Sequence, residues 1–83
     1  MNQFDRNDTY SKVVNLIAQK LNTDKSAIVP TKTLQELGAD SLDLVEIIMK
    51  LEEQFGMEIN DADAETLVNI DDVVNYVHQR RTK

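Results

Sequence analysis

Apolar residues recur every three or four positions in three separate segments of the chain. In the first segment they are Tyr10, Val13, Val14, Ile17 and Leu21. This spacing places them on one face of a helix, because successive helical residues are rotated by about 100°. Asp8 or Thr9 is expected to cap the N-terminus of that helix. The first segment is therefore predicted to be an amphipathic helix with one buried face.

The second segment predicts a helix over residues 41–55 with two apolar groups on its surface. It is expected to stop at Gly56, because glycine readily adopts the left-handed conformation that ends a helix. The group expected to face the core comprises Leu44, Ile47, Ile48, Leu51 and Phe55. The other group, Leu42, Val45 and Met49, borders acidic residues. We expect Leu42 and Met49 to be partly exposed and to suit protein contact, whereas Val45 either joins them or packs beneath a loop.

The third segment, "NIDDVVNYVHQRR", predicts the last helix. Asn69 and Asp72 have the spacing of a capping box, in which each side chain binds the backbone amide of the other. Val73, Val74 and Val77 fall on one side. The two arginines near its end suit the negative end of a helix dipole.

The connections between these helices differ in length. Residues 22–40 lack long periodicity, but Thr33 and Glu36 also match a capping box, and nearby apolar residues can hold the segment against a core. We expect an ordered loop with one short helical turn there, and one short helix within residues 60–68. The predicted fold is all-α: a small four-helix bundle of three main helices and one short helix, with a long ordered loop between helices one and two.

Length and composition support a single domain. The 83 residues, 41% of them apolar, cannot form two separate cores, so we predict one domain over residues 1–83 with frayed ends at 1–7 and 80–83. There is no cysteine, which excludes disulfides and any thiol chemistry of the chain's own. No apolar run approaches the roughly 18 residues of a membrane span, and the first residues lack a secretory apolar segment. We expect a cytoplasmic monomer.

Negative charge is concentrated in one part of the chain. Residues 40–72 contain eleven acidic residues and one basic residue, Lys50, which gives this stretch a net charge of −10 against −6 for the whole chain. Such a surface repels nucleic acid and attracts basic patches on other proteins. It could also serve only to keep a small protein in solution.

Ser41 stands at the start of the acidic helix and has three possible roles. Asp40 is the better N-cap, which leaves the Ser41 hydroxyl at the first helical position and free to react. A hydrolase nucleophile is excluded, because the single histidine, His78, lies in the last helix and no glycine-rich oxyanion loop is present. A phosphate attached to Ser41 would be stabilised by the amides and dipole of the helix N-terminus. The remaining alternative is a second cap.

One acidic stretch partly matches a calcium-binding loop. Asp61, Asp63, Glu65 and Asp72 fall at positions 1, 3, 5 and 12 of an EF-hand, but Thr66 replaces the glycine at position 6 and position 12 is not glutamate. We expect no true calcium loop, while weak binding of divalent cations by the acidic surface stays open.

The segment "LGADSLDLVE", Leu37 to Glu46, resembles the attachment signature of acyl carrier proteins, whose Asp-Ser-Leu serine receives 4′-phosphopantetheine from coenzyme A. The likeness runs from about Tyr10 to Val77 and includes "LEEQFGMEI" and "DDVVNYV". It implies that the chain is a non-catalytic carrier and that Ser41 bears the arm, with Asp40 and Leu42 beside it in the attachment site. The thiol of that arm would hold acyl chains as thioesters.

The resemblance also implies partners and two further groups of residues. The partners are a phosphopantetheinyl transferase (holo-ACP synthase) and acyl-processing enzymes with basic docking patches. The implied docking residues are Asp40, Leu42, Asp43, Val45, Glu46, Met49, Glu52 and Glu53. The implied lining of an acyl cleft comprises Ile59, Ala64 and Leu67.

Several alternatives remain at this point. Lys50 interrupts the acidic stripe and either pairs with Glu46 or Glu53 or selects a particular partner. Fatty acid biosynthesis is the expected pathway, and a dedicated polyketide, peptidyl or D-alanyl carrier is the alternative. The competing class is an unmodified acidic helical interaction module, in which Ser41 would be only part of a cap.

Overall fold

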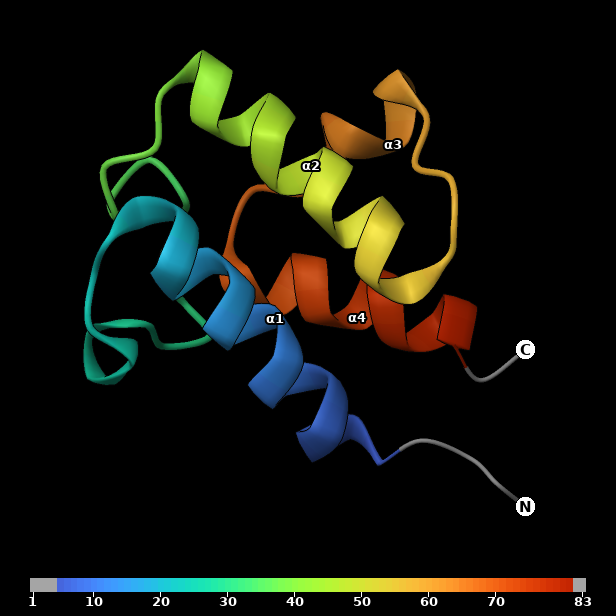
Figure 1. The fold of residues 1–83 in the computed structure, drawn as a ribbon, viewed down its shortest axis with the longest axis horizontal. Helices are drawn as coiled ribbons and strands as arrows, with labels where there is room; N and C mark the ends of the chain where they lie inside the picture. The colour runs from blue at the N-terminus through green and yellow to red at the C-terminus, as the bar shows by residue number, and fades with distance from the viewer. Residues whose placement is uncertain (1–4, 82–83) are drawn as a thin grey trace.

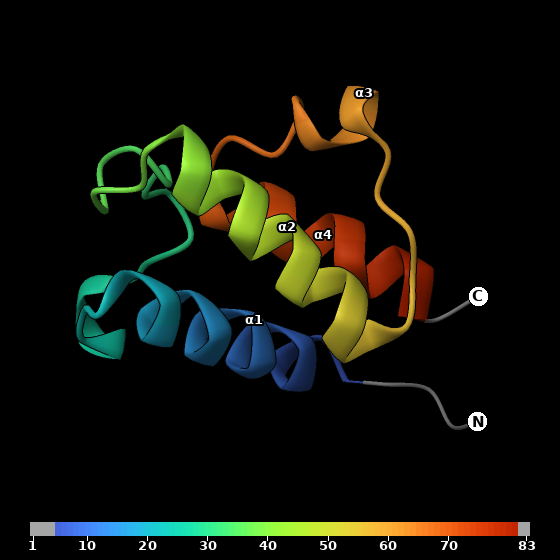
Figure 2. The ribbon, with the colours of Figure 1, turned by 45° about the horizontal axis from the view of Figure 1, so that its top comes forward.

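The computed structural model describes residues 5–81 and confirms the predicted all-α fold. Its elements are α1 (Arg6–Leu21), a 3₁₀ turn η1 (Lys25–Ala27), α2 (Ser41–Phe55), α3 (Asp61–Ala64) and α4 (Ile70–Arg81). α1 packs against both α2 and α4, and α3 lies beside α2 on the side away from α1 (Figures 1 and 2). Within residues 5–81 no helix is long and apolar enough to span a membrane.

The core is formed by the predicted apolar faces of the three long helices. Residues with no exposed surface come from all three and include Val13, Ile17, Ile47, Leu51, Ile70, Val73, Val74 and Val77. Of the other residues predicted for these faces, Val14 is also buried, and the rest, such as Tyr10 and Phe55, are half-buried and pack against this centre. The short α3 contributes no fully buried side chain of its own.

The beginning of α1 differs from the prediction. Its N-cap is Asp5, whose Oδ1 accepts a hydrogen bond from the Asn7 amide at 3.1 Å, rather than Asp8 or Thr9. Helical residues therefore begin at Arg6, and α4 continues through Arg81. Residues 6–7 and 80–81, expected to be frayed, are therefore helical, and apart from the cap residue Asp5 the rest of that expectation falls on residues 1–4 and 82–83, outside the described part of the chain.

Asp8 and Thr9 are instead used to join α1 to α4. The hydroxyl of the fully buried Thr9 lies 3.0 Å from His78 Nδ1 and accepts a hydrogen bond from Arg81 Nη1 at 2.9 Å. Arg81 Nη2 also donates to Asp8 Oδ2 at 3.1 Å. These contacts satisfy a polar group that would otherwise be costly to bury.

The Asp8–Arg81 contact predicts a pH dependence of stability. The hydrogen bond from Arg81 is the main reason that the pKa of Asp8 lies below its usual value of about 4. A carboxyl whose pKa is lower in the folded state stabilises the fold above its unfolded pKa, and this contribution is lost as the pH falls through the folded pKa. We expect Asp8→Asn to be less stable than the parent at about pH 7 and to lose less stability than the parent on going to about pH 3. Urea unfolding at both pH values measures this, and equal losses would contradict it.

The other predicted helix ends are confirmed. Gly56 has φ +62° and ends α2 in the left-handed conformation. Asn69 and Asp72 exchange the two hydrogen bonds of a capping box, at 2.8 Å from the Asp72 amide and 3.3 Å from the Asn69 amide. The geometry that ends α2 and starts α4 is thus encoded locally.

The long loop is ordered by local turns and by pairing with a distant segment. Thr33 and Glu36 exchange side-chain to backbone hydrogen bonds of 2.9 and 3.0 Å, as predicted. The loop also holds the short helical turn expected within residues 22–40: it is the 3₁₀ turn η1, which begins after Asp24, whose side chain accepts from a nearby amide. The loop backbone also pairs with the segment before α4, for example from the Leu34 amide to the Val68 carbonyl at 3.1 Å. This pairing fixes the position of the loop that leads into the start of α2.

Candidate functional site

Ser41 is the first residue of α2 and is exposed. The N-cap is Asp40, as predicted: the Asp43 amide donates to its Oδ1 at 2.9 Å, and the Asp40 amide donates to Asp43 Oδ2 at 3.2 Å. Because these two aspartates complete the capping box, Ser41 is not needed as a cap. Within residues 5–81 its hydroxyl makes no hydrogen bond, so it is available to a modifying enzyme.

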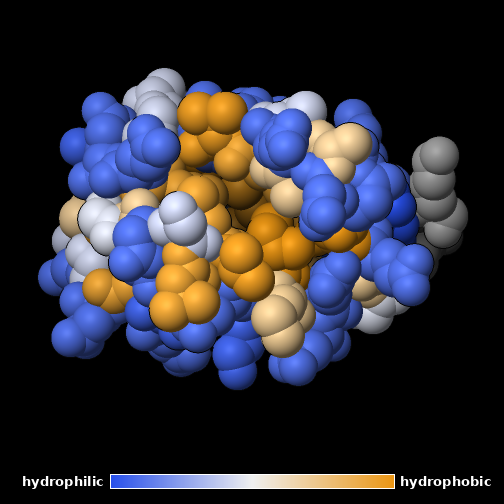
Figure 3. Space-filling view, turned by 90° about the horizontal axis from the view of Figure 1, so that it is seen from above, coloured by the Kyte–Doolittle hydropathy of each residue, from blue (hydrophilic) through white to orange (hydrophobic). Residues whose placement is uncertain are grey.

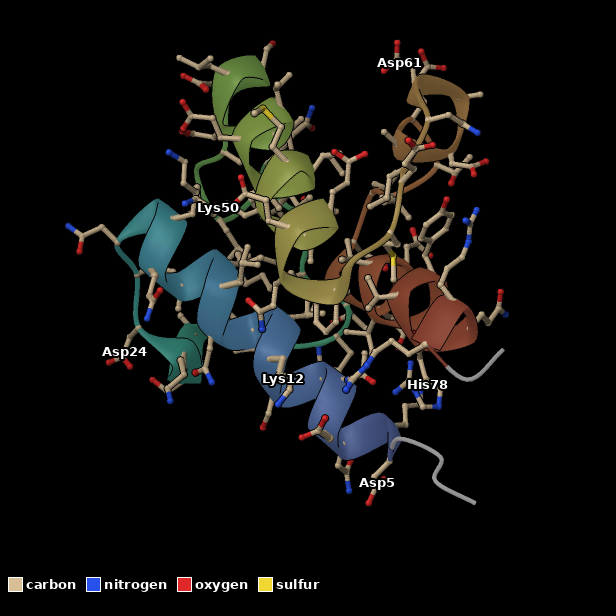
Figure 4. The ribbon with its side chains drawn as sticks, turned by 45° about the vertical axis from the view of Figure 1, so that its right-hand side comes forward. Asp5, Lys12, Asp24, Lys50, Asp61 and His78 are labelled. Carbon is tan, nitrogen blue, oxygen red and sulfur yellow. The ribbon has the colours of Figure 1, made fainter. Side chains whose placement is uncertain are left out.

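The surroundings of Ser41 do not form a hydrolase site. His78 lies near the end of α4, far along the molecule from the start of α2, and its ring is bound to Thr9 (Figure 4). The groove that Ser41 borders is lined instead by carboxylates and apolar side chains. Within residues 5–81 the site therefore presents a hydroxyl that no neighbouring side chain binds.

The apolar strip on α2 is exposed along its full length. Leu42 is 64% exposed, Val45 is 55% exposed and Met49 is 53% exposed. The expected exposure of Leu42 and Met49 is confirmed, and Val45 joins them instead of packing beneath the loop. The strip begins one residue after Ser41, so a protein that reaches Ser41 also meets these side chains.

The acidic residues of α2 are not equally available to a partner. Asp40 and Asp43 are engaged in the capping box. Glu46 forms an ion pair with Lys20 of α1, and Glu52 Oε2 accepts a hydrogen bond from the Ile59 amide at 2.8 Å. In the part of the chain that the structure describes, Glu53 makes no such contact and is exposed.

Lys50 does not form either of the pairs expected for it. Among residues 5–81 it forms no ion pair, and Glu46, one of the two expected partners, is bound by Lys20 instead. Lys50 lies on the side of α2 nearer α1 (Figure 4), where it borders a small surface recess with Lys20 and Glu53. Helical spacing could not reveal Lys20 as the competitor, since that pair depends on how α1 packs on α2.

An open groove of about 740 Å³ runs from Ser41 between α2 and α3. The three residues expected in a cleft, Ile59, Ala64 and Leu67, all line it. The sequence reasoning missed its other apolar lining residues, Leu34, Leu44, Val45, Ile48 and Met49. Seen from above, apolar side chains surround this hollow on the surface (Figure 3). An apolar chain attached near Ser41 could therefore enter it.

The acids of the partial EF-hand pattern do not converge. Asp63 accepts a hydrogen bond from the Tyr76 hydroxyl at 2.7 Å, and Asp72 belongs to the α4 capping box. Asp61 lies at the outer end of α3 (Figure 4). No group of three or more metal-ligating side chains forms among residues 5–81.

Comparison with known proteins adds a family and a fold. The family model described as "Phosphopantetheine attachment site" matches residues 11–77. A protein named acyl carrier protein from Campylobacter jejuni subsp. doylei is 50% identical over 83% of this chain and 91% of its own length. One of the same name from Rubrobacter xylanophilus is 44% identical over 94% of this chain and 98% of its own length.

The same architecture occurs in a distant solved structure. The NMR structure of an HMG-ACPI domain from the CurA module of Lyngbya majuscula superposes with a TM-score of 0.87 at 18% identity, over 99% of this chain and 83% of that one. At this identity the likeness supports the fold alone.

Proposed function

The chain belongs to the acyl carrier proteins of the phosphopantetheine attachment-site family, and from that premise we propose that Ser41 is the residue that bears its arm. Members of this family are non-catalytic carriers with covalently bound 4′-phosphopantetheine. The observation that supports Ser41 most directly is its unengaged, exposed hydroxyl at the mouth of an apolar groove. When attached, the arm supplies the thiol that this cysteine-free chain lacks.

The residues around Ser41 fit a phosphate-linked arm. The helix N-terminus stabilises an attached phosphate, while Asp40 beside it repels the negative charge. The proposed phosphopantetheinyl transferase supplies the catalysis that attaches the group. Asp40 and Leu42 complete the attachment site in this proposal: Asp40 holds the helix start, and Leu42 offers an apolar contact to the transferase.

The groove is proposed to shelter the acyl chain. Ile59, Ala64 and Leu67 form its far wall, and Leu44 and Ile48 of α2 form the near wall. An apolar chain in this groove would leave water at a gain of about 25 cal/mol per Å² of buried surface. The open sides allow the chain to leave again when a partner enzyme binds.

Partner docking is assigned to the exposed strip of Leu42, Val45 and Met49 and to the acids beside it: Asp40, Asp43, Glu46, Glu52 and Glu53. An apolar strip bordered by acids fits an apolar patch surrounded by basic residues. The phosphopantetheinyl transferase and the acyl-processing enzymes are the proposed partners. A single domain, a monomeric state and a cytoplasmic location belong to the same proposal.

Glu53 gives the cleanest test of the charge contribution to docking, because it stabilises no other part of the chain that the structure describes. We expect Glu53→Lys to slow modification by the transferase severalfold at low salt and by less at high salt, since salt screens exposed charges. Urea unfolding should give nearly the parent's stability. Modification rates equal to the parent's at low salt would remove Glu53 from the docking surface.

We assign the carrier to fatty acid biosynthesis. In support, the relatives that this chain matches at 44–50% identity are named acyl carrier proteins, and acyl groups are the intermediates of fatty acid synthesis. The test is to offer two sources of substrate to the chain that bears the arm with its terminal thiol free. Malonyl transfer by a transacylase of fatty acid synthesis is expected. Selective loading by an amino-acid adenylating enzyme would instead indicate a dedicated secondary pathway.

A further inference from the structure

α3 forms one wall of the groove but has little packing of its own to hold it there. It spans only four residues, Asp61–Ala64, and none of them is buried. So short a helix is not stable by itself. Its position must therefore depend on contacts made by the segments that flank it and by its own polar side chains.

The first of these contacts comes from α2. Glu52 is half-buried and lines the groove, and its Oε2 accepts a hydrogen bond from the Ile59 amide at 2.8 Å. Ile59 lies in the connection between α2 and α3, is 6% exposed and also lines the groove. The Glu52 carboxylate thus holds the Ile59 backbone in the position that places the Ile59 side chain along the groove.

The second contact comes from α4. Asp63 Oδ2 accepts hydrogen bonds from the Tyr76 hydroxyl at 2.7 Å and from Arg80 Nη2 at 3.3 Å. Arg80 Nη2 also donates to the Tyr76 hydroxyl at 2.6 Å, and its guanidinium lies over the Tyr76 ring at 4.6 Å from the centroid. Three side chains from two helices therefore meet at one carboxylate oxygen behind α3.

We propose that Glu52 and Asp63 are positioning residues that anchor the α3 wall of the groove from its two sides. This inference rests on the proposed function, because it takes the groove to be the shelter for the acyl chain. It gives Glu52 a second role beside the docking contact proposed for its charge. A docking carboxylate acts through its charge, whereas Glu52 acts as an acceptor for a backbone amide in a half-buried place, where losing the acceptor leaves that amide unpaired.

The two roles of Glu52 are separated by a pair of substitutions. Glu52→Gln removes the charge but keeps a carbonyl oxygen that can accept from Ile59, and Glu52→Ala removes both. If Glu52 is a positioning residue, Glu52→Gln should hold the Ile59 amide as the parent does, and Glu52→Ala should not. Docking through the charge predicts that Glu52→Gln and Glu52→Ala slow modification by the transferase to the same extent. Glu53→Ala is the matched control, because Glu53 is the next residue on the same helix and makes no such hydrogen bond within residues 5–81.

The direct measurement is hydrogen exchange of the Ile59 amide, followed by NMR on the full unmodified chain. We expect Glu52→Ala to speed exchange at Ile59 by about tenfold or more, while Glu52→Gln and Glu53→Ala stay within about threefold of the parent. Core amides such as that of Ile17 report whether each variant is folded. Unchanged exchange at Ile59 in a folded Glu52→Ala variant would overturn the anchoring role of Glu52.

The Asp63 anchor is tested with Tyr76→Phe, which removes the hydroxyl but keeps the ring. Exchange of the Ala64 amide, which donates to the Asn60 carbonyl at 2.9 Å, is expected to rise severalfold in this variant. No rise would overturn the α4 anchor. Both exchange tests use the chain without its arm, so their failure leaves the carrier assignment intact, and a failure of arm attachment would leave the exchange results standing.

The consequence for function is measured on chains loaded with an octanoyl group. If the anchors hold the wall of the shelter, the thioester of Glu52→Ala should be attacked by a small external thiol severalfold faster than that of the parent or of Glu52→Gln. Equal rates for the three loaded chains would contradict a role for this anchor in sheltering the acyl chain.

Discussion

Ser41→Ala is expected to abolish attachment of the phosphopantetheine arm and all acyl loading while the fold is retained. The attachment bond is a phosphate ester to the serine oxygen, and alanine has no oxygen to form it. The fold should survive because Ser41 is exposed and its hydroxyl makes no hydrogen bond within the described chain. The helix start is kept by Asp40 and Asp43, which complete the capping box without Ser41. Mass spectrometry after treatment with coenzyme A and transferase measures the loss.

The matched control is Ser11→Ala. Ser11 is also exposed and helical, but it lies on α1 and outside the groove. It should accept the arm at the parent's rate. Residual attachment on a folded Ser41→Ala variant would show that the arm is carried elsewhere, and unfolding of that variant would contradict the view that Ser41 has no structural role.

Leu51→Ala is expected to unfold a large fraction of the molecules. Leu51 has no exposed surface and lies at the centre of the core on α2. Truncating a buried leucine to alanine costs about 2–5 kcal/mol, because it loses buried apolar surface and leaves a cavity. A domain of this size has a stability on the order of 5 kcal/mol, so the loss is comparable with the total. Urea unfolding followed by circular dichroism should show a much lower midpoint or no folded baseline.

Leu42→Ala tests the same substitution on the same helix at an exposed position. Leu42 is 64% exposed, so its removal should change the free energy of unfolding by less than about 1 kcal/mol. It should instead slow modification, because Leu42 belongs to the proposed docking strip. Similar destabilisation by the two substitutions would contradict the division of α2 into a core face and an exposed strip.

Much of the fold could be predicted because it is encoded by local signals. The bounds of α2 follow from Asp40 at one end and Gly56 at the other, and the capping box of Asn69 and Asp72 marks the start of α4. The start of α1 could not be located as well, since Asp5, Asp8 and Thr9 are all acceptable caps. Tertiary contacts decide among them: Asp8 and Thr9 bind α4 residues that are distant in sequence, which leaves Asp5 as the cap.

The site shows the same division between local and tertiary information. The exposed serine after a capping aspartate and the apolar strip beyond it could be predicted from helical periodicity. The sequence could not predict which acidic residues are free to contact a partner. Glu46 and Glu53 look equivalent in the sequence, yet Lys20 of α1 pairs with Glu46 and leaves Glu53 without such a contact in the described chain. That difference arises from helix packing, which no spacing rule contains.

The most direct test of the central claim is the intact mass of the purified parent chain before and after incubation with coenzyme A and a broad-specificity phosphopantetheinyl transferase. The account predicts a gain of one 4′-phosphopantetheine per chain, located at Ser41 by fragmentation of the modified peptide. A folded chain that starts unmodified and gains no mass, or gains it at another residue, would contradict the claim that Ser41 carries the arm.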